Sequence, residues 1–227
     1  MEKVPLRVLH VTEGFDGGVV TFLRHVLPAQ RARGAAVSLV CSPRHERRQE
    51  RDLEYFRRRG IEVHKIHMDR SLRPWGDATA LLALIRLLRG NRFDVVHTHC
   101  FKAGLLGRIA ARVVGRCAVV HTPHCFPFLR MRSRMGAWVS RRVERFLARW
   151  TDCLLHVSES QRQAAVKARI APNGPGEVIP NGLPAADRRE HGSHESLRQL
   201  LCLGRTGPVV GMFCRLVRYK RPDHLIR

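Results

Sequence analysis

Residues 6–41 read LRVLHVTEGFDGGVVTFLRHVLPAQRARGAAVSLVC, and they hold one complete unit of an α/β fold. The apolar run at 6–11 is typical of a strand, and a glycine-rich turn follows it. A helical pattern over 19–33 then ends in an arginine before Gly34, as helix C-termini prefer, and a second apolar run begins at residue 37. A strand, a helix and a second strand in this order predict a βαβ unit with parallel strands.

The same alternation continues to about residue 179. Helical patterns at 47–59 and 77–89 each end in an arginine that is followed by glycine. Four apolar residues of the second pattern share one helix face: Leu81, Leu84, Ile85 and Leu88. Further strand-like runs lie at 62–66, 95–97, 118–121, 153–157 and 178–179. The predicted fold class is therefore α/β, a doubly wound parallel sheet with helices on both faces.

The amino-acid composition changes at Pro180, after which Pro, Gly, Asp, Arg and His become frequent. We therefore predict a first domain at 1–179, an interdomain hinge at 180–207, and the first strand and helix start of a second domain at 208–227. A domain with one strand and half a helix cannot bury a core of its own. The sequence thus predicts that the second domain is incomplete in this chain.

The 227 residues carry 41 Lys plus Arg against 19 Asp plus Glu, a formal charge of +22. A hydrophobic content of 44% excludes a disordered polycation. The charge suits nucleic acid, an anionic membrane surface or phosphorylated small molecules, and composition alone does not choose among them. Only 6% of residues are aromatic, and neither a recognition helix nor a stacking platform is recognisable, so no specific nucleic acid is expected.

The apolar runs are too short for a signal peptide core or for the roughly 20 residues of a membrane-spanning helix. Seven cysteines, an odd number without a CxxC pair, are expected to be buried, reduced thiols. The predicted location is the cytoplasm.

Two segments have the pattern of a phosphate site. Residues 13–18, EGFDGG, place Gly17 and Gly18 at a helix N-terminus, where free N–H groups attract an anion. The spacing is not GxGxxG, and a plain tight turn is the alternative. In the segment 209–223, Arg215 and Lys220 flank a tight loop before another helix N-terminus, so two cations converge there.

Histidines gather at the ends of two consecutive predicted strands. His97 and His99 follow one strand, with Lys102 opening the next helix, and His121 and His124 follow the other. In an open α/β sheet, ligands bind at the carboxyl ends of strands. A packing role is the alternative, above all for His97. A metal site is not expected, because no HExxH helix occurs and both nearby cysteines follow a histidine directly, an awkward spacing for chelation.

The stretch 130–149 carries seven arginines and a single acidic residue. One apolar stripe contains Met135, Val139, Val143, Phe146 and Trp150. A basic stripe contains Arg134, Arg141, Arg145 and Arg149, with Trp138 beside it. A basic amphipathic helix with tryptophan is typical of membrane-surface binding, and a solvated helix face is an equal alternative.

Together these motifs resemble the family 4 retaining glycosyltransferases of the GT-B fold, specifically bacterial members that act in surface-polysaccharide and lipid-linked sugar synthesis. The resemblance covers the whole chain and depends on the order and spacing of five segments. They are Gly17-Gly18, 94–99 with 102–108, 121–124, 157–159 with 178–182, and 215–217 with Lys220. It implies a Rossmann-like N-terminal half of a GT-B fold and the start of the donor-binding domain.

The resemblance also implies a function, a hexosyltransferase that moves a sugar from a nucleotide-sugar to a lipid-linked or saccharide acceptor with retention of configuration. No cofactor or metal is implied. Gly17, Gly18, Arg215 and Lys220 would bind the donor phosphates, with the two cations neutralising the leaving diphosphate. His121 would lie near the transferred sugar. The implied acceptor-binding residues are His99, Lys102 and His124.

Two departures and two alternatives accompany this prediction. Cys214 and Arg221 stand where relatives often have glycine, and the family's Glu-x7-Glu motif lies beyond residue 227. The chain alone is therefore expected to be inactive, and peripheral on the inner face of the cytoplasmic membrane. The alternatives are a basic nucleic-acid-binding α/β domain, and a non-catalytic remnant or half of a split transferase.

Overall fold

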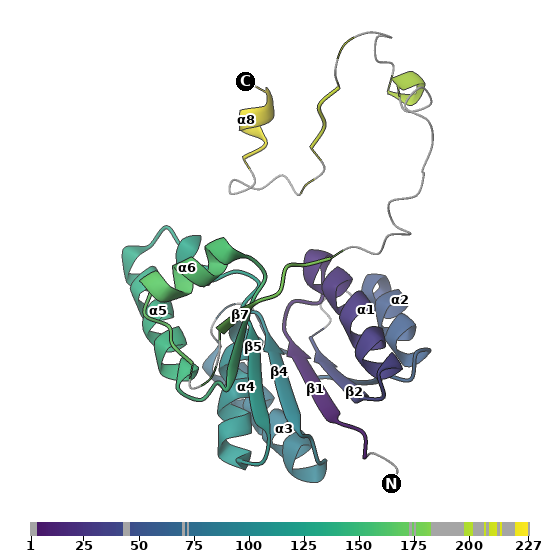
Figure 1. The fold of residues 1–227 in the computed structure, drawn as a ribbon, viewed down its shortest axis with the longest axis vertical. Coiled ribbons are helices and arrows are strands. Elements are labelled where there is room, and N and C mark those ends of the chain that lie inside the picture. Colours follow the sequence, from purple (N-terminus) through teal and green to yellow (C-terminus); the bar gives the residue numbers. More distant parts are fainter. Residues whose placement is uncertain are drawn as a thin grey trace. The chain divides into compact units, whose positions relative to one another are not determined.

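A computed structural model describes residues 4–42, 46–69, 71, 73–172, 174, 176–182, 198–201, 207, 209–212, 214 and 221–226. The chain divides into two compact units, Met1–Asn181 and Gly182–Arg227 (Figure 1). The boundary falls two residues after the predicted end of the first domain at 179.

The first unit is built on a seven-stranded sheet in which every pairing is parallel, as predicted. Its strands are β1 (Arg7–Thr12), β2 (Ala36–Cys41), β3 (Glu62–Lys65), β4 (Val95–His99), β5 (Ala118–Thr122), β6 (Cys153–His156) and β7 (Gly176–Val178). They lie in the order β3-β2-β1-β4-β5-β6-β7. The chain thus runs outward from β1, returns to pair β4 with β1, and continues in the opposite direction.

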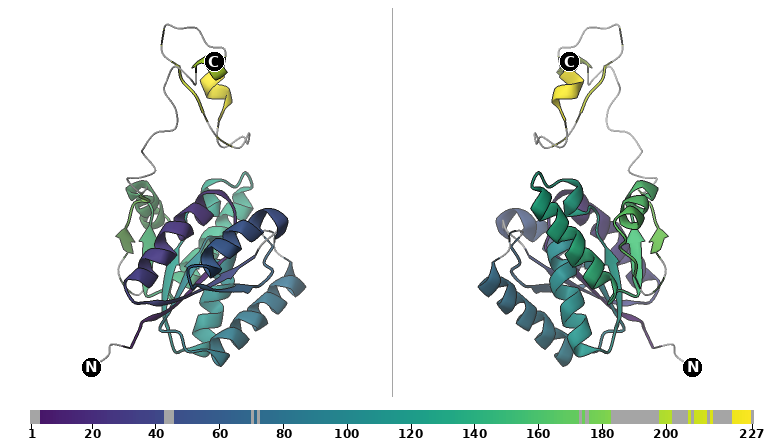
Figure 2. Two further views of the ribbon diagram at one scale, coloured as in Figure 1. Left: turned by 90° about the vertical axis from the view of Figure 1, so that its right-hand side faces the viewer. Right: turned by 90° about the vertical axis from the view of Figure 1, so that its left-hand side faces the viewer.

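Helices cover both faces of this sheet, which confirms the predicted doubly wound class (Figure 2). Helices α1 (Gly17–Ala32) and α2 (Glu46–Arg57) pack on one face through Leu23, Leu27 and Phe56. Helices α3 (Pro74–Gly90) and α4 (Phe101–Val114) pack on the other through Leu84 and Leu106. Because parallel crossovers are right-handed, the reversal at β1 and β4 sends the later helices to the opposite face.

The remaining elements of the first unit are a 3-10 turn, η1 (Pro127–Leu129), and the helices α5 (Arg134–Ala148) and α6 (Glu159–Lys167). A third apolar cluster joins them to β6 through Phe126, Leu154 and Ile170. A buried ion pair, Arg108 Nη2 to Glu144 Oε2 at 2.8 Å, links α4 to α5. This pair fixes which face of α5 turns inward.

The second unit is described only in short pieces. The helix start expected near residue 223 is confirmed by α8 (Asp223–Ile226). The strand expected at 208–213 is absent from its described residues, 209–212, which belong to no sheet. No strand of the described chain pairs with this segment, and an isolated strand has no hydrogen-bond partners.

No helix among the described residues is long and apolar enough to cross a bilayer. None of the six described cysteines forms a disulfide. Cys41 is buried, whereas the others are half-buried: Cys100, Cys117, Cys125, Cys153 and Cys214. The expectation of buried thiols therefore holds for Cys41 and is wrong for those five. Cys100, Cys117 and Cys125 lie in connections just outside strands, and Cys153 begins β6, so the sheet does not enclose them.

Candidate functional site

The reversal of strand order between β1 and β4 defines the candidate site. At such a switch point the loops that follow the two strands diverge, and open α/β sheets bind ligands in the crevice at the carboxyl ends of their strands. Four segments come together there: the loop after β1, the N-terminus of α1, the N-terminus of α4 and the loop after β5.

The N-terminus of α1 is open. Gly17 and Gly18 begin the helix, and a Cβ atom added to either would meet no atom within 4 Å apart from its chain neighbours and the backbone of its own helix. Gly17 has a φ of +56°, which a glycine adopts without strain. The Asp16 side chain makes no capping hydrogen bond, and the first turn contains no acidic residue. The positive end of α1 is thus presented with free space around it, as an anion site requires.

The N-terminus of α4 is closed by the protein's own carboxylate. Glu13 is buried, and its two oxygens accept hydrogen bonds from the backbone N–H groups of Lys102 at 3.1 Å and Ala103 at 3.0 Å. Cys100, the N-cap residue, has φ 65° and ψ −174°, a region that is essentially reserved for glycine. The Glu13 carboxylate therefore already occupies the anion-binding position at the N-terminus of α4.

Lys102 does not present its ammonium at the site. Its side chain is 1% exposed, and Nζ lies 2.5 Å from Asp77 Oδ2 on α3. The pair joins α3 to α4, so Lys102 supports packing and offers no exposed charge to an acceptor.

The histidines divide between the two faces of the sheet. His97 and His99 point to the same side, as the strand period predicts, and their ring centroids lie 4.2 Å apart. This is the side of α1. His121 points to the opposite side, where it is fully buried under α4.

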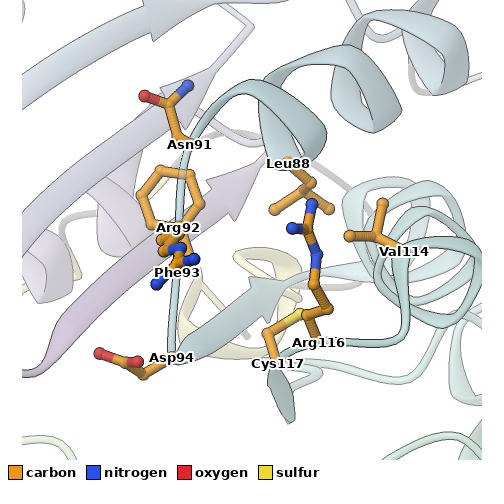
Figure 3. A pocket seen from close by; sticks show the side chains of 8 residues that line it. All are labelled: Leu88, Asn91, Arg92, Phe93, Asp94, Val114, Arg116 and Cys117. Atoms are coloured by element: carbon orange, nitrogen blue, oxygen red, sulfur yellow. The ribbon is translucent and has the colours of Figure 1, made fainter.

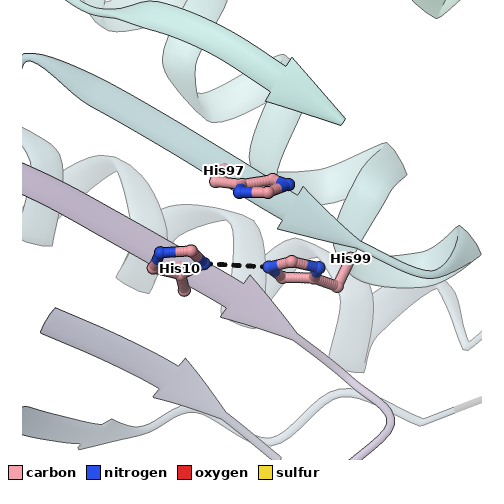
Figure 4. Close-up of side chains that lie close together, drawn as sticks. All are labelled: His10, His97 and His99. Atoms are coloured by element: carbon pink, nitrogen blue, oxygen red, sulfur yellow. Dashed lines mark hydrogen bonds between the residues drawn. The ribbon is translucent and has the colours of Figure 1, made fainter. Parts of the chain in front are cut away.

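A histidine that the sequence patterns did not single out, His10 of β1, completes the cluster on the α1 side. His10 lies opposite His97 in the β1–β4 register, and its ring lies edge to edge with that of His99 and nearly parallel to it, with ring centroids 5.2 Å apart (Figure 4). His10 Nδ1 is 2.9 Å from His99 Nε2, and His10 Nε2 is 2.8 Å from Gln30 Oε1 on α1. His10 can be identified as part of the cluster only from the pairing of β1 with β4, and that pairing joins segments about 90 residues apart.

The cluster reaches the edge of the sheet through His124. His99 Nδ1 is 3.2 Å from His124 Nε2, and Phe22 of α1 packs edge-on against His124 with ring centroids 5.0 Å apart. His124 is half-buried and has a φ of 53°, a conformation that histidine tolerates better than most residues. It is therefore the histidine of this cluster that lies in a loop at the carboxyl edge.

Burial keeps these rings neutral. It lowers the pKa of His10 to about 4 and that of His124 to about 4, from the usual 6.5. Burial also lowers the pKa values of His97 and His99 well below 6.5, and the neighbouring histidines lower them further. At neutral pH each ring therefore carries one N–H donor and one acceptor nitrogen.

His10, His97 and His99 are the group of described residues best placed to hold a metal, with one ring nitrogen from each within 4.8 Å of the others. Two nitrogens bound to a tetrahedral zinc at 2.0–2.1 Å would be roughly 3.3 Å apart. The 2.9 Å between His10 and His99 is shorter and suits a direct hydrogen bond. His97 Nε2 is also engaged, at 2.8 Å from Thr122 Oγ1. Hydrogen bonding thus accounts for the arrangement.

His121 lies where it cannot touch a bound sugar. Its Nδ1 is 2.9 Å from Thr98 Oγ1 and 3.2 Å from the Thr98 carbonyl oxygen, and its side chain is 0% exposed. Gly104 of α4 makes room for the ring, since a Cβ there would lie 2.5 Å from His121 Cε1. The alternation of side chains along β5 places His121 under α4, while His124 lies beyond the strand.

The outer face of α5 is both basic and apolar. Its inward face consists of Ala137, Ser140, Glu144, Leu147 and Ala148, because the Arg108 pair draws Glu144 inside. Large apolar side chains are therefore left outside, led by Met135 at 68% and Trp138 at 52% exposure. Val139 and Phe146 are also exposed, as are Arg134, Arg141 and Arg149. Arg145 is half-buried and donates to the Ala168 carbonyl oxygen.

A further hollow lies at the opposite edge of the sheet. A cavity of about 360 Å³ is lined by residues that precede β4 and β5, among them Asn91, Asp94, Arg116 and Cys117 (Figure 3). It lies at the amino ends of the strands, away from the switch point, and we assign it no ligand. The two predicted phosphate-binding cations, Arg215 and Lys220, lie outside the described residues.

The sequence matches a known family over most of the first unit. The family described as glycosyl transferase 4-like domain matches residues 17–182. The chain belongs to this family. The match begins at the open N-terminus of α1 and ends just after β7, so it contains all strands of the sheet except β1.

A curated relative of this glycosyl transferase 4-like domain is the UDP-Gal:alpha-D-GlcNAc-diphosphoundecaprenol alpha-1,3-galactosyltransferase of Escherichia coli. The two are 36% identical over 107 residues, which are 47% of this chain and 28% of the relative. An uncharacterized 41.2 kDa protein in the cps region of Klebsiella pneumoniae is 26% identical over 172 residues, which are 74% of this chain and 44% of the relative. The chain spans less than half the length of these relatives.

The fold is shared with GT-B glycosyltransferases of known structure, of which the chain covers about half. A glycosyltransferase from Rickettsia africae superposes with a TM-score of 0.62 at 12% identity, over 90% of this chain and 51% of that protein. The predicted GT-B half is thus confirmed at the level of the fold.

Proposed function

We propose that this domain is the acceptor-side half of a glycosyltransferase that moves a sugar from a nucleotide-sugar to a lipid-linked or saccharide acceptor, with retention of configuration. The observation that carries the proposal is the difference between the two helix N-termini at the switch point. The N-terminus of α4 is filled by Glu13, whereas that of α1 is open at Gly17 and Gly18. A donor diphosphate fits the open one.

Family membership supports the assignment of this chemistry to the site. The E. coli relative is by name a transferase that uses a UDP-sugar and a diphosphoundecaprenol-linked acceptor. A nucleotide-sugar places a diphosphate beside a sugar, and the site offers a helix N-terminus beside a cluster of histidines. We assign the diphosphate to Gly17 and Gly18, and the sugar to the His124 edge. We give His124 the role that the family resemblance implied for His121, because His121 is buried under α4.

In the reaction, the helix N-terminus stabilises the negative charge that develops on the leaving diphosphate. Fixed N–H donors do this without reorganisation, which is where electrostatic catalysis gains its advantage. His124, which is neutral at physiological pH because burial lowers its pKa, binds and orients a hydroxyl group, and no metal or other cofactor is part of the proposal.

Binding of UDP by the 227-residue chain tests the diphosphate assignment. Gly18→Leu places a side chain in the free space before α1, so we expect about tenfold weaker binding or worse in calorimetry, a loss of about 1.4 kcal/mol. Gly90→Leu is the matched control, since its Cβ also meets open space but lies at the far end of α3. Equal UDP affinity in wild type and Gly18→Leu would contradict the proposal.

Retention and the acceptor are tested by the reaction itself, in a protein that contains this domain together with a complete donor-binding domain. UDP-galactose and a GlcNAc-diphosphoundecaprenol acceptor are the first substrates to try, by likeness to the E. coli relative. NMR of the product gives the anomeric configuration of the new bond. Retention requires the configuration of the donor, and the inverted anomer would contradict this part of the proposal.

The outer face of α5 supports a place at an anionic membrane surface. Exposed Trp138, Met135 and Phe146 alternate there with exposed arginines, and Arg142 lies 5.0 Å from the ring centroid of Trp138. Apolar side chains enter the headgroup region while arginines meet anionic lipids, which is how interfacial helices bind. This surface follows directly after the loop that carries His124, so a lipid-linked acceptor held in the membrane would lie beside the site.

Vesicle co-sedimentation tests the membrane assignment. We expect binding to anionic vesicles that weakens with salt and is lost in Arg141→Glu/Arg149→Glu. Arg51→Glu/Arg86→Glu changes the same charge on exposed residues of α2 and α3 and should bind like wild type apart from the shift in net charge. Equal loss in both double variants would show that net charge, and not the α5 surface, drives the binding.

A further inference from the structure

The histidine cluster contains a continuous chain of hydrogen bonds that runs from the helix α1 to the sheet edge. Its links are Gln30 Oε1 to His10 Nε2 at 2.8 Å, His10 Nδ1 to His99 Nε2 at 2.9 Å, and His99 Nδ1 to His124 Nε2 at 3.2 Å. Each imidazole uses both of its nitrogens except the last.

The amide oxygen of Gln30 gives this chain a direction. It can only accept, so His10 carries its proton on Nε2. His10 Nδ1 is then an acceptor, which requires the proton of His99 to be on Nε2. By the same step His99 Nδ1 accepts, and His124 carries its proton on Nε2.

Burial maintains this order. A cationic ring would have two donors and would break the sequence of donor and acceptor, but burial lowers the pKa of His10 and of His124 to about 4. His97 packs beside the chain without interrupting it, with its ring centroid 4.9 Å from that of His10 and its Nε2 bonded to Thr122.

We propose that Gln30, His10 and His99 are positioning residues that hold His124 as the tautomer protonated on Nε2. The ring nitrogen that His124 can offer to a ligand, Nδ1, is then an acceptor and not a donor. On the proposed function, from which this inference takes its ligand, His124 binds a hydrogen-bond donor such as a sugar hydroxyl. It does not donate to a phosphate oxygen, so phosphate and hydroxyl recognition are divided between the N-terminus of α1 and His124.

Nitrogen NMR of the ligand-free chain labelled with ¹⁵N-histidine tests the tautomers, because protonated and unprotonated ring nitrogens resonate far apart. In wild type at neutral pH we expect His10, His99 and His124 each to be a single Nε2-protonated species. A proton on Nδ1 of His124, or a cationic ring, would overturn the proposal. This measurement needs no substrate. The tautomer proposal can therefore be wrong while the transferase proposal holds, and the transferase proposal can be wrong while the tautomer proposal holds.

Two variants test the direction of the chain. Gln30→Met keeps the length of the side chain but removes the acceptor, so His10 and His124 should both become mixtures of tautomers. His99→Phe cuts the chain in the middle, so His124 should become a mixture while His10, still bonded to Gln30, should not. Gln163→Met is the matched control on α6, where Gln163 is bonded to Glu159, and should leave every tautomer unchanged.

One result would contradict the coupling between the tautomers of His10 and His124. If Gln30→Met changes His10 and leaves His124 as a single species, the three rings are independent and the positioning role is wrong. A merely structural role for Gln30 would alter stability without moving the tautomer of His124, which lies three hydrogen bonds away.

Discussion

The two helices that meet at the switch point begin in opposite ways. Helix α4 is anchored: Glu13 caps it, Lys102 pairs with Asp77, and Arg108 pairs with Glu144 inside the protein. Helix α1 begins with two glycines in open space and no acidic residue in its first turn. The same strand arrangement thus produces one helix end that serves the fold and one that is left for a ligand. Substitutions on the α4 side should cost stability, and those at the start of α1 should cost binding.

The largest effect is expected from Arg108→Ala. It leaves the Glu144 carboxylate buried and unpaired, so the free energy of unfolding should fall by about 3–5 kcal/mol in denaturant titrations. Arg108→Met/Glu144→Leu removes both charges and should recover most of that loss. A double variant as unstable as the single one would show that the ion pair is not the source of the stability.

The second-largest effect is expected from acid, which should lower the free energy of unfolding through the buried histidines on the α1 face of the sheet. The pKa of His10 is lowered from 6.5 to about 4, so the unfolded chain binds more protons between these values, and stability present above pH 6.5 is lost as the pH falls toward 4. His10 alone should contribute about 2 kcal/mol of loss between pH 7 and pH 5. Unfolding measured at both pH values in wild type and in His10→Gln should show a smaller loss in the variant. The exposed His67→Gln should retain the loss of wild type.

A pair of glycine substitutions compares the two helices directly. Gly104→Ala puts a Cβ 2.5 Å from His121 Cε1 and should destabilise the protein by about 1–3 kcal/mol through overpacking. Gly18→Ala meets no atom within 4 Å and should change the unfolding free energy by less than about 0.5 kcal/mol. Thermal unfolding of both variants decides the matter. Equal destabilisation would mean that Gly18 is a structural glycine.

A smaller loss of stability than that of Arg108→Ala is expected from Glu13→Ala. The N–H groups of Lys102 and Ala103 lose their acceptors, at a cost of about 1–2 kcal/mol typical of a lost helix cap. Glu13→Gln keeps an acceptor oxygen and should lose less. If Glu13→Ala unfolds at the same denaturant concentration as wild type, the anchoring of α4 by Glu13 is wrong.

Local patterns predicted the scaffold because strands and helices leave local signals. The apolar runs, the arginine and glycine at helix ends, and the two histidine-rich strand ends all appeared where expected. The α5 face was harder, because its orientation follows from Arg108 and Glu144, which lie 36 residues apart. The role of Glu13 at α4 spans 89 residues, and no spacing rule connects the two.

The histidines show where sequence reasoning reached its limit. The register of β4 against β5 pairs Thr98 with His121, so His121 lies on the opposite face from His97 and His99, and the spacing within either strand alone does not give this register. His10 could be found only from the register of β1 against β4, in which it lies opposite His97. Pairing between distant strands is determined by the fold as a whole, so a search for motifs along the chain does not detect it.

The central claim, that a diphosphate binds at the start of α1 and not at the start of α4, is tested most directly by amide NMR of the chain during titration with UDP. We expect the N–H signals of Gly17 and Gly18 to shift in proportion to occupancy, while those of Lys102 and Ala103, held by Glu13, stay in place. Shifts confined to Lys102 and Ala103, or to the cavity beside Asn91 and Arg116 at the opposite edge, would contradict it.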